Sequence, residues 1–457
     1  MAWSHVANRG TAQNKTSSAT FSISPTATIS PGAILVLWVA MDNNNNSTIT
    51  GPVGDQLIVE DTAGNAWAKV FEAQDASSNN RCQACLAVCQ VKNQLTTSHS
   101  IVVSHALSNR VAKAMSLEEF SLPDGQVWST SGRAIHRHDR GVDPGGISFG
   151  TIPLTEHLLL HLLAGEGPDT DAYTWDSDYT QITGTGTTGG ADESNMHIRG
   201  GYRIATVTGD TVDVTSDTAD RDYTQGVVAL LAFTSGEFPE TSVLDDFNRA
   251  NESPLGGGWN VGCRSTLSPN NNLQVTSNQA ATTGSGTNGQ LWSTIFTTID
   301  QDAWATIATP PGAAGHIGVL TNGPDSGITH ACNTVSADCQ AVIWRVGDGD
   351  GVPPARLFLT RGGGGGVVET ACHIVVYGVG NPSAGYKLGL RRRSGINEIW
   401  WDKGSGWEYA GVAYYDNQFS QGRLGLVFTD SGTRADDFGG GIPSPAFVPQ
   451  IIRRTFS

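Results

Sequence analysis

Charged residues are scarce in this chain. Only 15% of its 457 residues are Asp, Glu, Lys or Arg, whereas soluble domains average about 25%. The outward faces of amphipathic helices normally carry many Glu and Lys side chains, so this shortage argues against a helix-rich fold. The net charge of −16 repels phosphate backbones, which argues against nucleic acid as a partner.

Long apolar runs are also missing. The longest run, from Ala33 to Met41, has the length of a strand, and a membrane-spanning helix needs about 20 residues. The N-terminus, Met1 to His5, has neither a basic segment nor an apolar segment followed by a cleavage site. The sequence therefore predicts no membrane insertion and no export by a signal peptide.

Cysteine is rare, and seven residues is an odd count, so at least one thiol is unpaired. Synthesis in the cytosol favours reduced thiols. Cys82, Cys85 and Cys89 are close in sequence, but no fourth metal ligand is nearby and the intervening residues are apolar. We expect a buried strand in which Cys85 and Cys89 share a face. A metal or redox site and a local disulfide are the alternatives.

Turn-forming and strand-forming residues are abundant instead. The chain has 56 Gly, and short apolar runs bounded by Gly, Pro, Asn or Asp recur along its length. Expected strands include Ile34–Ala40, Leu158–Ala164 and Val227–Phe233, with His157 and His161 on the less buried face of one strand. This pattern predicts an all-β protein built from β-sandwiches.

A polar stretch with Pro and Gly lies between Phe233 and Val243 and is typical of a linker. The predicted organisation is an N-terminal domain at 1–236, a linker at 237–243, a second domain at 244–440 and a C-terminal arm at 441–457. We expect the arm to dock on a neighbouring subunit.

Four segments of the first half carry a recognisable order of strands and turns: Thr20–Pro25, Ser30–Val36, Glu156–Ala164 and Gly226–Phe233. In this order they resemble a domain of bacteriophage tail, fibre and head-decoration proteins. The resemblance implies a jelly-roll-like sandwich, a location in the virion and other virion proteins as partners. It also implies a homo-oligomer, with a trimer favoured.

The second half resembles a laminin-G or concanavalin-A-like jelly roll. The resemblance rests on the opening Asp246–Asn251, Pro254–Gly256 and Trp259, and on the closing Arg434–Phe438. It implies that the first and last strands lie side by side, with Phe247 and Phe438 in one core. It also implies a structural calcium ion, whose ligands the sequence does not assign.

No arrangement of catalytic residues is evident. Retaining glycoside hydrolases use two carboxylates about 5–5.5 Å apart, usually on an E-x-D-x-x-E strand, and no such string occurs. Glu398 and Asp402 share a strand face but lie roughly 13 Å apart. We predict no catalytic residue, no cofactor and no metal-ligand set, and therefore not an enzyme. A glycan-degrading enzyme is the remaining alternative.

Two tryptophans are candidate glycan contacts. Trp401 and Trp407 flank a Gly404–Gly406 hairpin, where exposed indoles could stack on sugar rings. The alternative is a plain hairpin with one neighbouring Trp in the core and Trp407 packed across the turn.

Taken together, these patterns predict a structural component of a phage virion, in a capsid-decoration, head-fibre or tail-surface position. It would act by assembly and by adhesion to surfaces, including host-surface glycans. The alternative is a carbohydrate-binding or receptor-binding protein.

Overall fold

The computed structural model describes residues 3–42, 57–74, 82–105, 109–138, 144–216, 221–239, 241–259, 273–282, 288–313, 315–323, 340–347, 354–361, 372–415, 421–428 and 430–443. Within these ranges the protein is all-β, as predicted, and its one helical element is the 3-10 turn η1 (Asp192–Ser194). A search of this part of the chain finds no helix that could cross a membrane.

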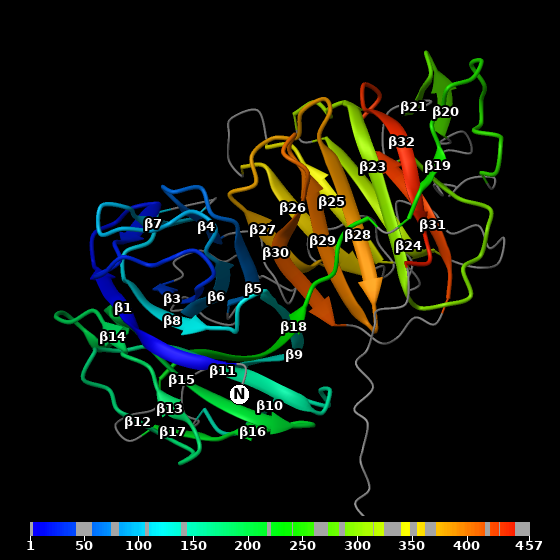
Figure 1. Cartoon of the computed structure of the whole chain (residues 1–457). Coiled ribbons are helices and arrows are strands. Elements are labelled where there is room, and N and C mark those ends of the chain that lie inside the picture. Colours follow the sequence, from blue (N-terminus) through cyan, green and yellow to red (C-terminus); the bar gives the residue numbers. More distant parts are fainter. Residues whose placement is uncertain are drawn as a thin grey trace, which may run out of the picture.

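Two large antiparallel sheets run through both halves of the molecule (Figure 1). The 11-stranded sheet has the order β1 (Ser4–Asn14), β8 (Lys113–Ser121), β3 (Ile34–Asp42), β6 (Cys82–Gln90), β5 (Trp67–Gln74), β27 (Cys372–Tyr377), β26 (Arg356–Arg361), β25 (Gln340–Arg345), β24 (His316–Gly323), β31 (Arg423–Phe428) and β22 (Asn288–Leu291).

The 14-stranded sheet has the order β13 (Thr180–Gln181), β15 (Met196–Val207), β11 (Thr155–Glu166), β18 (Tyr223–Thr234), β9 (Gln126–His138), β30 (Trp407–Tyr415), β29 (Ile396–Asp402), β28 (Lys387–Arg393), β23 (Gln301–Thr309), β32 (Arg434–Gly441), β21 (Gln279–Thr282) and β20 (Leu273–Thr276). Beside this path, β14 (Thr185–Gly186) pairs with β15, and β19 (Val243–Asp245) pairs with β32. The β9–β30 contact is a parallel bridge between Thr130 and Tyr414.

The two large sheets enclose one continuous core. Alternate residues of each strand face it, as the period of two requires. The core includes Trp38 and Leu160 from the first half and Trp344 and Leu390 from the second. The apolar core therefore does not stop at the boundary predicted between the two halves.

A buried polar network lies where the 11-stranded sheet passes from one half to the other. β5 pairs with β27 from Trp67 to Lys69. The Lys69 ammonium donates to Glu72 at 2.5 Å and to the Tyr377 hydroxyl at 3.2 Å. The Lys69 and Glu72 side chains are fully buried, so each offsets the charge of the other within β5, and the hydrogen bond to Tyr377 crosses the junction.

Smaller sheets cover the outward faces of the first half. A three-stranded sheet of β2 (Thr20–Ile23), β7 (Ile101–His105) and β4 (Leu57–Asp61) packs on the 11-stranded sheet. Two ladders pack on the 14-stranded sheet: β10 (Ile147–Ser148) with β16 (Thr211–Val212), and β12 (Tyr173–Trp175) with β17 (Val214–Ser216). Both faces of strands β3 and β11 are therefore buried.

These extra layers correct the prediction for the two histidines of β11. His157 and His161 are fully buried, rather than on a less buried face, because the β12–β17 side of the sheet is covered. The cysteine prediction is confirmed in its main point. Cys85 and Cys89 share one buried face of β6 and Cys82 lies on the other, and none of the three forms a disulfide.

The residues at the start of the second half form a cluster of hydrogen bonds and aromatic contacts. Asp245 accepts hydrogen bonds from the Arg249 guanidinium at 2.6 Å and from the Trp259 indole at 2.6 Å. The Trp259 ring lies 4.9 Å from the ring of Phe438 and 6.0 Å from that of Phe247. Since β19 pairs with β32, Phe247 and Phe438 share one core, as the resemblance implied.

The segment predicted as a linker is held by Phe238 and, at its end, by the pairing of Val243 with Gly439. Phe238 is 7% exposed and packs on the 14-stranded sheet of the second half. Most of the predicted C-terminal arm, 444–457, lies outside the described residues.

Candidate functional site

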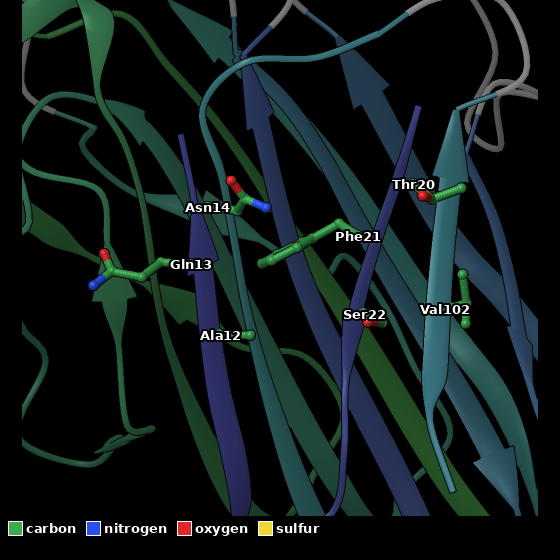
Figure 2. Close-up of a pocket in the computed structure, with 7 residues that line it drawn as sticks. All are labelled: Ala12, Gln13, Asn14, Thr20, Phe21, Ser22 and Val102. Atoms are coloured by element: carbon green, nitrogen blue, oxygen red, sulfur yellow. The ribbon is translucent and has the colours of Figure 1, made fainter. Parts of the chain in front are cut away.

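A pocket of about 550 Å³ lies beside the edge strands β1 and β2. Ala12, Gln13, Asn14, Thr20, Phe21, Ser22 and Val102 line it. Figure 2 shows the Phe21 ring extending from its strand toward the strand that carries Asn14. We call this the β1–β2 pocket.

Strand pairing sets the direction of each lining side chain. β2 pairs with β7 in a register that places Ser22 opposite Val102. Alternation along β2 turns Phe21 inward, where it is 6% exposed, and leaves Thr20 and Ser22 on the outward side. The pocket therefore has an aromatic base and hydroxyl groups at its rim.

The turn between β1 and β2 is held by two lysines that point away from the lining. Lys113 donates to the Thr16 carbonyl at 2.9 Å and to the Ser18 hydroxyl at 2.8 Å. Lys15 donates to the Asn195 side chain at 2.9 Å. Because these ammonium groups are engaged elsewhere, the pocket itself is lined by neutral groups.

The lining determines what the pocket can do chemically. Gln13 offers an amide oxygen and an amide NH₂ group, Asn14 offers its NH₂ group while its oxygen accepts from the Thr16 backbone at 2.6 Å, and Thr20 and Ser22 offer hydroxyls. None of the seven lining side chains titrates near neutral pH, so they cannot transfer protons. The arrangement supports binding of an uncharged polar ligand.

The predicted glycan-contacting tryptophans lie elsewhere, in the second half. Trp401 is 5% exposed and belongs to the continuous core, with the Lys403 ammonium 4.1 Å from its ring centre. Trp407 is half-buried on the opposite face of the sheet, with its ring 4.8 Å from that of Phe238. The two indoles therefore do not form one platform.

Glu398 and Asp402, the acidic pair identified from the sequence, have different roles in the structure. Asp402 accepts hydrogen bonds from the backbone of Gly404 at 2.7 Å and of Gly406 at 3.0 Å, so it holds the hairpin turn. Glu398 is buried and accepts a hydrogen bond from the Trp400 indole at 3.1 Å. Burial raises the pKa of Glu398 to about 7, although Arg391 and Trp400 oppose the shift.

No group of three or more His, Cys, Asp or Glu side chains could hold a metal ion among the residues that the structure describes. The structure thus assigns no ligands to the calcium ion that the resemblance implied.

Sequence reasoning missed the β1–β2 pocket. Gln13 and Val102 are far apart in the chain and line one pocket only through the packing of β1, β2 and β7. The one available signal was the expected strand around Phe21, which says nothing about a neighbouring opening.

No protein-family model and no curated protein sequence matches the chain. Among solved structures, a family 66 carbohydrate-binding module from Bacillus subtilis matches at 14% identity, over 39% of this chain and 91% of its own, with a TM-score of 0.26. A legume lectin-like domain from Entamoeba histolytica matches at 13% identity, over 38% and 87%, with a TM-score of 0.30. At these identities the likeness concerns the β fold alone. The predicted virion role is tested by neither match and stays a prediction.

Proposed function

We propose that the protein binds carbohydrate without transforming it, and that the β1–β2 pocket holds one or two rings of an uncharged glycan. The observation that carries this proposal is the lining: it includes the amides of Gln13 and Asn14, the hydroxyls of Thr20 and Ser22 and the ring of Phe21, and no lining side chain is charged. A volume of about 550 Å³ lies within the range of about 300–1,000 Å³ typical of small-molecule sites.

The chemistry of a sugar ring fits this lining. Its hydroxyls donate and accept, which matches the double capacity of the Gln13 amide and the NH₂ group of Asn14. Its apolar C–H face can pack on the small part of the Phe21 ring that reaches the pocket, since Phe21 is only 6% exposed. A charged glycan would leave its charge without an opposite partner in the lining, so neutral glycans are the expected class.

The test uses a glycan array followed by calorimetric titration of the strongest neutral glycan. The variant Gln13→Ala with Ser22→Ala removes two polar groups from exposed positions, so the fold should survive. We expect an affinity loss of about tenfold or more, since two hydrogen bonds contribute about 1–3 kcal/mol together.

The matched control is Thr11→Ala with Ser24→Ala, two exposed positions near the same strands but outside the lining. It should bind like the wild type. Unchanged affinity in the pocket variant would place the glycan elsewhere, and an array without any neutral hit would refute glycan binding.

A further inference from the structure

The outward face of the 14-stranded sheet in the second half carries a group of aromatic and charged side chains. Alternation separates them from the core: Leu388, Leu390 and Trp401 face inward, and Arg391 and Trp400 face outward. Trp304 of β23 and Trp407 of β30 flank them on the same outward face.

Phe238 from the predicted linker sits in the middle of this group. Its ring stacks on Trp400 at 5.3 Å and 11°, and the edge of Trp407 meets it at 4.8 Å and 79°. The Arg391 guanidinium lies 5.1 Å from its centre. Gly389 makes room, because a Cβ there would lie 2.3 Å from the Phe238 ring. We call these contacts of Phe238 the Phe238 site.

The polar groups around the Phe238 site exceed what a phenyl ring can use. Arg391 donates to both oxygens of Asp302, at 3.0 and 3.1 Å, and the Glu398 carboxyl lies beside Trp400. The Trp304 indole N–H is buried and has no hydrogen-bond partner among the described residues, but it packs over Gly439, whereas Phe238 covers Gly389 on the other side of β23. A phenyl ring cannot donate a hydrogen bond to the carboxylates of Asp302 and Glu398.

Phe238 is also the main attachment of its segment to this face. Of the described residues 235–239 and 241–242, it alone is buried, and none of them belongs to a strand. Displacing one side chain would therefore release the segment without breaking a sheet.

We propose that the Phe238 site is a second site for one sugar ring, which Phe238 occupies from within the same chain. Stacking on Trp400 serves a sugar face as it serves a phenyl face. The sugar hydroxyls would add hydrogen bonds to Glu398 and Arg391, which Phe238 cannot supply. Neither the location nor the chemistry of this site depends on the β1–β2 pocket.

The test measures the binding of a panel of neutral oligosaccharides made of hexose units, by calorimetric titration and by tryptophan fluorescence. All variants are made in the Gln13→Ala with Ser22→Ala background, so that binding at the β1–β2 pocket does not contribute. Phe238→Ala should bind at least tenfold tighter than its parent. Phe238→Leu, which fills the site less well and cannot stack, should fall between them.

Two further variants tie the gain to this site. Trp400→Ala added to Phe238→Ala should return the affinity to that of the parent. Glu237→Ala alone, an exposed change in the same segment, should leave the affinity of the parent unchanged. Thermal melting reports which variants are folded. If Phe238→Ala does not fold, the comparison of Phe238→Leu with the parent decides. Equal affinity in a folded Phe238 variant and the parent, or a gain that survives Trp400→Ala, would overturn the proposal.

Discussion

The 14-stranded sheet shows two very different outward faces. In the first half, β11, β15 and β18 bury histidines under the short β12–β17 ladder. In the second half, β23, β28 and β29 bury Asp302, Arg391 and Glu398 beside the site that Phe238 occupies. One sheet thus buries polar side chains among two different kinds of neighbour.

The first face uses neutral hydrogen bonds. The Trp175 indole donates to His161 Nδ1 at 3.1 Å, and His161 Nε2 lies 3.0 Å from the Gln225 side-chain oxygen. Since Nδ1 accepts, the proton belongs on Nε2, and the ring is neutral. Burial lowers the pKa of His161 to about 4 and that of His197 to about 3.

The second face uses charges. The Arg391 and Asp302 side chains are fully buried and paired, and burial holds the Glu398 carboxyl nearer its protonated form by raising its pKa. In the neutral network each group has a hydrogen-bond partner and no charge is buried. In the charged network each buried charge is stable only while its opposite partner is present. The difference teaches that the same strand geometry can bury neutral imidazoles through hydrogen bonds on one face and a paired guanidinium and carboxylate on the other.

The largest expected effect is the loss of one charge from the second face. Asp302→Ala leaves the Arg391 guanidinium buried without that carboxylate, and should lower the free energy of unfolding by about 3–5 kcal/mol. Urea unfolding measures it. Adding Arg391→Leu should recover part of the loss; a double variant no more stable than Asp302→Ala would show that the charge pair is not the cause.

The next effect concerns pH on the first face. Because the pKa of His161 falls from 6.5 to about 4 on folding, the unfolded chain takes up the proton first, and stability is lost as pH drops from about 6.5 to 4. His161→Asn keeps an acceptor for Trp175 but does not titrate. Its stability should fall less than that of the wild type over this range, by up to about 3 kcal/mol. If unfolding experiments showed that the stabilities of the wild type and of His161→Asn change equally with pH over this range, the neutral network would be contradicted.

The smallest effect has the opposite sign and belongs to the second face. The pKa of Glu398 rises from 4.5 to about 7 on folding, so its contribution to stability is full below pH 4.5 and is lost as pH rises to 7. Glu398→Gln removes this dependence. Relative to the wild type, the variant should gain about 2 kcal/mol of stability between pH 4.5 and pH 6, measured by urea unfolding. If the variant instead lost stability relative to the wild type over this pH range, Glu398 would be ionised in the folded protein.

Much of the fold could be predicted from local patterns. The expected strand Leu158–Ala164 lies within β11, and Val227–Phe233 lies within β18. The placement of Phe247 and Phe438 in one core followed from the resemblance carried by motifs at both ends of the second half. What failed was the exposure of His157 and His161. Alternation tells which residues share a face, but not whether another sheet covers that face.

The candidate sites could be predicted far less well. Trp401 and Trp407 were selected for their indoles beside a turn, and the structure separates them onto opposite faces of the sheet. The β1–β2 pocket and the Phe238 site join residues from strands that are distant in the chain, and no spacing in the sequence records such contacts.

By itself, the sequence determined that this chain would form strands, roughly where they begin and end, and which side chains share a face, because those properties depend on neighbouring residues. Only the tertiary structure decided that the two large sheets would continue through both halves, that Phe238 would lie on Trp400, and that Gln13 and Val102 would line one pocket. These are contacts between segments far apart in the chain, and they depend on the packing of the whole core.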